Sequence, residues 1–165
     1  MNGTRCALDG CSFRYASDES ADGVERGVHA IDHVSLQARA GEVVMLVGRS
    51  GCGKTTVTRL LNGLAPEYFR GSLHGEARVG GLHAGVAAVE DYATEVGSVF
   101  QNPKTQYFHA NSTDELAFPC ENAGMEPSEI RRRIRERLRA FDVEHLHDRN
   151  IVDCSGGQQQ QLAVV

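Results

Sequence analysis

Hydrophobic and polar positions alternate along much of the first forty residues, a pattern typical of β-strands with one buried face. The alternation is broken but visible in Ala7–Tyr15, and it returns in His29–Glu42. A polar stretch, Ser17–Gly27, separates the two segments. We therefore predict two strands joined by a loop.

Two later segments are apolar without alternation. They are "EVVMLVG", Glu42–Gly48, and "EVGSVF", Glu95–Phe100. Continuous apolar runs of this length predict strands that are buried on both faces, as in a parallel sheet. Between them, "SLHGEARVGG", Ser72–Gly81, predicts a short strand with turns, and "GVAAVEDYA", Gly85–Ala93, a short helix.

Helical periodicity appears in three places. The first predicted helix is Lys54–Leu64, with apolar residues at helical spacing and Asn62-Gly63 and Pro66 at its end. From Asn111, "STDELAF" carries a capping-box pattern of Ser112 and Glu115, and Pro119 should kink or end that segment. The clearest helix is 126–141, with Pro127 in its first turn and the apolar stripe Ile130, Ile134, Leu138 and Phe141.

The turn between the apolar run and the first helix carries the clearest chemistry. "GRSGCGKT", Gly48–Thr55, fits the phosphate-binding P-loop pattern G-x-x-x-x-G-K-[ST]. Its glycines let the backbone turn N–H groups inward, and the helix that follows aims its positive end at the same place. Lys54 can then reach the β- and γ-phosphates, and Thr55 can bind Mg²⁺. The candidate nucleotide-binding residues are Gly48, Arg49, Ser50, Gly51, Cys52, Gly53, Lys54, Thr55 and Thr56.

Composition and charge narrow the kind of protein. The chain has 165 residues, of which 41% are hydrophobic and 24% charged, as in soluble globular proteins. It lacks the run of about 18 apolar residues that a transmembrane helix needs, and its first residues do not form a signal peptide. The net charge of −5 disfavours a nucleic-acid binder. We therefore expect a cytosolic protein.

Two groups of residues have plain structural interpretations. Five scattered cysteines without a CxxC pair predict reduced thiols rather than disulfides or a zinc site. The arginine-rich run 131–139 is interrupted by Glu136 and by the apolar stripe. We therefore interpret it as the solvated face of a helix rather than a nucleic-acid site.

With this P-loop, the chain resembles the ATP-binding subunits of ATP-binding cassette (ABC) transporters. It looks most like those of energy-coupling-factor transporters, which take up vitamins and cobalt. "VFQNPKTQYF" is similar to their Q-loop, and "CSGGQQQQLAVV" to the ABC signature. The resemblance implies an α/β P-loop NTPase fold of ABC type, with an antiparallel β subdomain, an incomplete RecA-like parallel-sheet core and a helical subdomain. It places the β subdomain and P-loop core in residues 1–110, the helical subdomain in 111–155 and the start of the signature helix in 156–165.

The resemblance also assigns roles outside the P-loop. Tyr15, in "SFRYASD", would stack on adenine, although a tyrosine in the core or in an edge strand is an equal interpretation. Gln101 would contact Mg²⁺, together with Thr55, and would relay the nucleotide state to the membrane partner. The signature residues would bind the γ-phosphate of ATP held by a second ABC ATPase subunit, paired head to tail. These residues are Ser155, Gly156, Gly157 and Gln158.

Further expectations follow from the resemblance. The expected cofactors are ATP and Mg²⁺. The expected partners are a second ATPase subunit and a transmembrane subunit, but no nucleic acid. The expected location is the cytoplasmic face of the membrane. Cys154 and Gln161 depart from the Leu and the Arg or Lys usual in the signature, and Pro119 lies in a segment that is normally helical.

The family motifs expected after the signature are not in the chain. They are a Walker B Asp, a catalytic Glu, a D-loop and a switch-loop His. No catalytic residue is therefore identified, and we interpret the chain as C-terminally truncated and expect no turnover. Two alternatives stay open: a binding-only remnant that does not hydrolyse ATP, and a soluble ABC ATPase acting on DNA or ribosomes.

Overall fold

The computed structural model describes residues 4–16, 29–102 and 105–165 and divides the chain into two compact units, Met1–Ser98 and Val99–Val165. The predicted loop 17–27 and two residues of the Q-loop segment, 103 and 104, lie outside the described residues.

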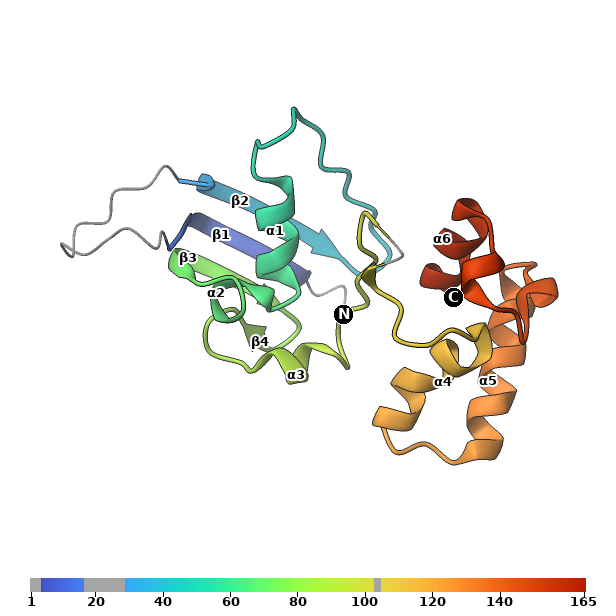
Figure 1. The fold of residues 1–165 in the computed structure, drawn as a ribbon. Helices are drawn as coiled ribbons and strands as arrows, with labels where there is room; N and C mark the ends of the chain where they lie inside the picture. Colours follow the sequence, from blue (N-terminus) through green and yellow to red (C-terminus); the bar gives the residue numbers. More distant parts are fainter. Residues whose placement is uncertain (1–3, 17–28, 103–104) are drawn as a thin grey trace. The chain divides into compact units, whose positions relative to one another are not determined.

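The first unit is built on an antiparallel sheet with the strand order β2-β1-β3-β4 (Figure 1). Its strands are β1, Thr4–Tyr15; β2, Ile31–Arg39; β3, Gly71–Val79; and β4, Leu82–His83. In the register, Leu8 of β1 pairs with Leu36 of β2, and Tyr15 pairs with Gly71 of β3. The strands predicted at Ala7–Tyr15, within His29–Glu42 and within Ser72–Gly81 are thus confirmed.

Among its described residues the same unit has three helices: α1, Lys54–Leu61; α2, Leu64–Glu67; and α3, Val89–Tyr92. α1 lies against one face of the sheet, where Val57 and Leu60 pack with Leu8 and Phe13 in the core. These four side chains are all at most 5% exposed, because alternation in β1 and helical spacing in α1 direct them to one layer. The helices predicted at Lys54–Leu64 and within Gly85–Ala93 are confirmed, the first ending three residues early.

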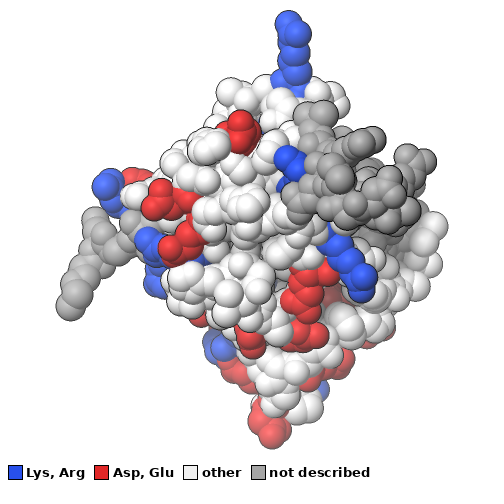
Figure 2. All heavy atoms as spheres, turned by 90° about the vertical axis from the view of Figure 1, so that its left-hand side faces the viewer, with Lys and Arg blue, Asp and Glu red and all other residues white. Residues whose placement is uncertain are grey.

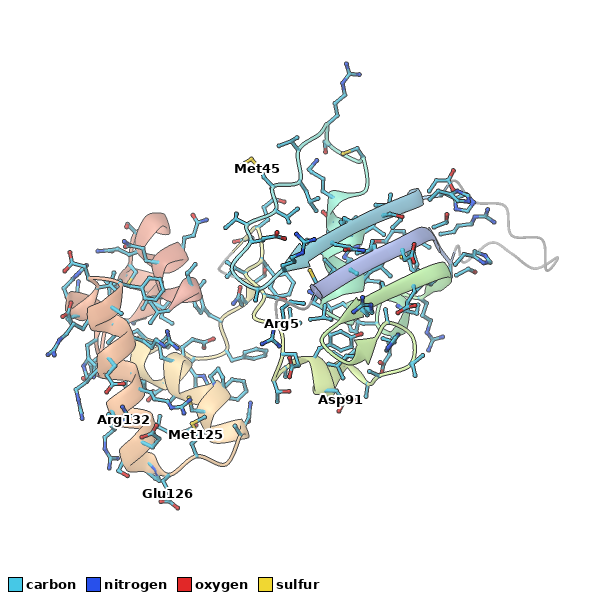
Figure 3. The ribbon with its side chains drawn as sticks, turned by 180° about the vertical axis from the view of Figure 1, so that it is seen from behind. Arg5, Met45, Asp91, Met125, Glu126 and Arg132 are labelled. Carbon is cyan, nitrogen blue, oxygen red and sulfur yellow. The ribbon has the colours of Figure 1, made fainter. Side chains whose placement is uncertain are left out.

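The two buried parallel strands predicted at Glu42–Gly48 and Glu95–Phe100 are wrong for this structure. Residues 43–49 and 96–100 form neither strand nor helix. Val43 is 94% exposed and Met45 is 81% exposed, and the Met45 side chain projects away from its segment (Figure 3). A parallel strand needs hydrogen-bonded neighbours on both sides, and the described residues supply none to either segment.

The second unit is helical. It contains α4, Ser112–Asn122; α5, Pro127–Ala140; two short 3₁₀ turns, Glu144–Leu146 and Ile151–Asp153; and α6, Gly156–Val164. The predicted stripe Ile130, Ile134 and Leu138 is buried and packs with Leu146 and Leu162, whereas Phe141 stays 42% exposed. Within the described residues, no helix is both long enough and apolar enough to cross a bilayer.

One prediction about α4 is wrong. Its N-cap is Asn111, whose side chain accepts a hydrogen bond from Thr113 N at 2.7 Å. The Ser112 hydroxyl instead donates a hydrogen bond to the Leu146 carbonyl, and the Glu115 carboxylate accepts hydrogen bonds from the backbone N–H groups of Phe108 and His109. The expected capping box therefore does not form. Pro119 cannot donate to the Glu115 carbonyl, yet α4 continues through it to Asn122.

Candidate functional site

The P-loop lies between the exposed segment 43–47 and α1. Gly51 has φ 79° and Gly53 has φ 92°, both in the left-handed region that favours glycine. A Cβ on Gly53 would also collide with the Ala30 carbonyl oxygen and the Ile31 side chain. Glycine at 53 is thus needed both for the turn and for the close approach of the loop to β2.

The N-terminus of α1 is open to a ligand. Gly53 is its N-cap, and no side chain of the described residues caps it. The first helical hydrogen bond runs from Val57 N to Gly53 O at 3.0 Å, which leaves the N–H groups of the first turn without a helical acceptor. Such groups, together with the helix dipole, bind phosphate.

Lys54 folds over this loop. Its ammonium donates hydrogen bonds to the carbonyl oxygens of Gly48 at 2.8 Å and Arg49 at 2.7 Å, and it lies 3.5 Å from Cys52 Sγ. Thr55 is exposed, and its hydroxyl makes no hydrogen bond within the described chain. An ammonium and a free hydroxyl at the start of one helix are the groups that phosphate and its Mg²⁺ need.

Thr56 differs from its neighbour. It is only 4% exposed, and its hydroxyl lies 3.0 Å from the Tyr15 hydroxyl. The Thr56 side chain therefore joins the P-loop helix to the end of β1. The structure thus places Tyr15 next to the P-loop helix, where its ring also packs against the core.

Sequence reasoning missed Arg59, which bonds Tyr15, and Phe69, the ring on which Arg59 stacks. Arg59 Nη1 donates to the Tyr15 hydroxyl at 3.0 Å, and its guanidinium lies 3.6 Å from the centre of the Phe69 ring. One signal was available, because Arg59 follows Thr56 by three residues and therefore shares its helix face. Nothing in the sequence placed Phe69, whose ring arrives from the segment after α2.

The signature residues start α6 in the second unit. Ser155 is the N-cap: its hydroxyl accepts from Gln158 N at 3.3 Å, and Gln158 Oε1 accepts from Ser155 N at 2.9 Å. In this reciprocal capping box the Gln158 side chain is occupied by its hydrogen bond to the helix start. The Ser155 hydroxyl only accepts in the box, so its own proton remains available to donate. Gly156 and Gly157 are exposed, with open space where a Cβ would be.

The next glutamine holds the turn before the signature. Gln159 is 4% exposed, and its amide donates to the carbonyl oxygens of Ile151 at 2.8 Å and Cys154 at 3.2 Å. The Tyr107 hydroxyl donates to the Gln159 carbonyl. Burial raises the pKa of the Tyr107 phenol, so it remains a donor at neutral pH. The glutamines thus form an ordered helix start, as predicted.

Gln101 is exposed and belongs to the second unit, as do the signature residues, whereas the P-loop and Tyr15 belong to the first. Within the described residues there is no group of three or more carboxylate, His or Cys side chains that would hold a metal.

The charged side chains are mixed in sign. On the face shown in Figure 2, Lys and Arg side chains are scattered with Asp and Glu among neutral residues. On α5 the arginines of the run 131–139 are exposed, as predicted for a solvated face. Two of them, Arg132 and Arg133, bond Glu129 at 2.7 and 2.8 Å, and these bonds lower the pKa of the Glu129 carboxyl to about 2.

Comparison with known proteins agrees with these observations. Residues 31–165 match the family described as ABC transporter. A protein of Treponema denticola named as a candidate ABC transporter ATP-binding protein is 40% identical over 130 residues, 79% of this chain and 27% of its own length. A similarly named protein of Pyrococcus horikoshii is 36% identical over 157 residues, 95% of this chain and 52% of its own. The chain therefore spans about half, or less, of the length of these curated relatives.

Solved structures show the fold. The cbiO1 protein of Clostridium perfringens, part of the ABC transporter complex cbiONQ, superposes with a TM-score of 0.79 at 23% identity, over 99% of this chain and 60% of its own. The dimeric bacterial ABC transporter cassette MJ0796 gives 0.75 at 22% identity, over 96% of this chain and 67% of its own. The α/β P-loop NTPase fold of ABC type is thus confirmed, and the chain belongs to the ABC transporter family.

Proposed function

We propose that the first unit binds ATP, with its phosphates on the P-loop. The observation that carries this proposal is the uncapped N-terminus of α1 directly beside the Lys54 ammonium. In the present arrangement Lys54 bonds main-chain carbonyls, which are weaker partners than phosphate oxygens. An incoming β- or γ-phosphate would replace these carbonyls as the hydrogen-bond partner of the ammonium. It would also accept hydrogen bonds from the free N–H groups at the start of α1.

The residues at the helix start also fit Mg²⁺. Thr55 offers an exposed hydroxyl oxygen, and Mg²⁺ is normally held by one or two protein oxygens together with phosphate oxygens and water. We propose that Thr55 and Gln101 supply the protein oxygens. Bound there, the ion would neutralise charge on the β- and γ-phosphates.

We propose that the adenine lies against Tyr15. This tyrosine ends β1, and its hydroxyl bonds Thr56, the second residue after Lys54. A base that stacks on the ring would therefore lie close to the phosphates that the loop binds. Stacking on an aromatic ring contributes about 1–3 kcal/mol per base in proteins that bind single-stranded nucleic acid.

The signature of the second unit would act on another molecule's nucleotide. Ser155 can donate its proton to a γ-phosphate while it still accepts from Gln158 N, and the two exposed glycines after it leave room for the phosphate. We propose that a second ABC ATPase subunit pairs head to tail with this one. MJ0796 is a dimeric cassette, and cbiO1 is part of a transporter complex, which supports the proposal.

In the wider assembly, we propose that the subunit drives uptake as in energy-coupling-factor transporters. It would work at the cytoplasmic face of the membrane, where a transmembrane subunit chooses the substrate. The form of the Q-loop, "QNP" followed by Gln106, supports this class. Co-purification with a membrane subunit would test it, and isolation with DNA or ribosomes in its place would favour a soluble ABC ATPase.

Binding and turnover can be separated experimentally. ATP bound without phosphate release would support the binding-only alternative. Steady phosphate release that is lost in Lys54→Met would exclude that alternative, because only a hydrolysing site turns ATP over.

Calorimetric titration with Mg²⁺ and ATP, ADP or AMP tests the proposed site directly. A loop that binds the β-phosphate should bind both ATP and ADP. It should bind AMP at least about tenfold more weakly, because each lost charge-assisted hydrogen bond costs about 1.5–3 kcal/mol. Equal affinity for AMP and ATP would contradict a phosphate-directed site.

A further inference from the structure

Arg59 makes two contacts in the first unit, one with the end of β1 and one with the segment after α2. Its guanidinium lies 3.6 Å from the centre of the Phe69 ring, and its Nη1 donates to the Tyr15 hydroxyl at 3.0 Å. A planar guanidinium can stack on a ring and donate a hydrogen bond at its edge at the same time, which an ammonium cannot do. Arg59 is half-buried, so both contacts are partly shielded from water.

The Tyr15 hydroxyl is consequently held by two partners. Its oxygen accepts from Arg59, which leaves its own proton to donate to Thr56 Oγ1 at 3.0 Å. Both partners stand on α1, and Thr56 is buried. The Tyr15 ring cannot rotate away from α1 without breaking both hydrogen bonds.

The other end of the ring is fixed by packing. Phe13, which is fully buried, meets the Tyr15 ring edge to face with ring centres 4.9 Å apart. The guanidinium of Arg59 is 5.8 Å from the centre of the Tyr15 ring, farther than from the Phe69 ring. Arg59 therefore holds Tyr15 mainly by its hydroxyl and uses Phe69 as its own support.

We propose that Arg59 is a positioning residue for the nucleotide base: stacked on Phe69, it fixes the Tyr15 ring at the distance from the P-loop that lets one ATP contact both. This inference rests on the proposed ATP site. It assigns to Arg59 and Phe69 a part in affinity although neither contacts the phosphates. A fixed ring loses no rotamer freedom on binding, and this preorganisation increases affinity for the base alone.

The test compares a ligand with a base and one without. Calorimetry of the full chain with Mg²⁺ gives the Kd for ATP and for inorganic tripolyphosphate. Arg59→Met should weaken the binding of ATP about fivefold. It should weaken the binding of tripolyphosphate by no more than about twofold, because it leaves the P-loop intact. Tyr15→Phe, which keeps the ring and the charge, should show the same selective loss.

The double variant and a matched control complete the experiment. Because both substitutions break the same hydrogen bond, Arg59→Met with Tyr15→Phe should weaken ATP no more than the stronger single change. Arg5→Met, at the opposite end of β1, removes an exposed arginine and should leave both affinities unchanged. Equal losses for the two ligands, unchanged ATP affinity or additive losses would overturn the role of Arg59. A wild-type chain that binds neither ligand would overturn the ATP site itself.

Discussion

Lys54 donates a hydrogen bond to the carbonyl oxygen of Gly48 at 2.8 Å, so the lysine and the first glycine of the P-loop pattern meet across the loop. This bond and its companion to Arg49 are near the surface. Each should contribute about 0.5–1.5 kcal/mol to folding.

Lys54→Met should therefore lower the free energy of unfolding of the first unit by at most about 3 kcal/mol. Urea denaturation followed by circular dichroism measures the change. A much larger loss would mean that Lys54 is chiefly a structural residue of the loop.

Ser155 gives a prediction that separates helix capping from phosphate binding. Ser155→Ala removes the N-cap of α6 and should destabilise the second unit by about 1 kcal/mol. Ser155→Asp keeps a capping acceptor, so stability should stay near wild type. Its negative charge would repel the γ-phosphate of a second subunit, so ATP-dependent dimerisation should be lost, as measured by light scattering. Dimerisation of Ser155→Asp equal to wild type would contradict the proposed role of the signature.

The helical core of the second unit depends on Leu138. This side chain is 1% exposed and packs in the cluster of α5, Leu146 and Leu162. Leu138→Ala should cost about 2–5 kcal/mol, because it removes buried methyl groups and leaves a cavity. Arg135→Ala, exposed on the same helix, should change stability by less than about 0.5 kcal/mol. Urea denaturation of both variants, followed by the helical signal in circular dichroism, measures the two changes. Equal losses in the free energy of unfolding would contradict the predicted stripe.

Glu129 gives a pH dependence. Its hydrogen bonds to Arg132 and Arg133 lower its pKa to about 2, below its ordinary value. A carboxyl with a lowered pKa in the folded state adds stability that is present above the unfolded pKa and is lost as the pH falls through the folded pKa. The stability difference between wild type and Glu129→Gln should therefore be constant above about pH 5 and disappear toward pH 2.

Thermal unfolding at several pH values and low salt measures this difference. Added salt should reduce it, because the pair is exposed. Glu121→Gln, which removes an exposed carboxylate on α4, is the matched control and should not reproduce the profile. A difference that grows as the pH falls would contradict the assignment.

The local patterns predicted most of the elements and the chemistry of the loop. Alternation placed β1 and β2, the 3.6-residue period placed α5, and the spacing from Gly48 to Thr55 placed the P-loop at the start of α1. Each of these signals depends on residues close in the sequence, so a short window contains it.

The errors arose where distant residues decide the structure. Val43 and Val99 lie in segments whose apolar composition predicts buried strands, but burial requires neighbours that the sequence pattern cannot supply. Asn111 replaced Ser112 as the cap of α4 because the Ser112 hydroxyl bonds Leu146, a residue 34 positions away. Phe69 reaches Arg59 through a turn that has no periodicity.

The central claim is that this chain binds ATP through the P-loop, and calorimetric titration of Mg²⁺ and ATP into wild type and Lys54→Met tests it most directly. We predict that wild type binds and that Lys54→Met, while still folded by circular dichroism, binds at least about tenfold more weakly, since it loses a charge-assisted bond to phosphate worth about 1.5–3 kcal/mol. Equal ATP affinity of the two folded proteins would contradict the account.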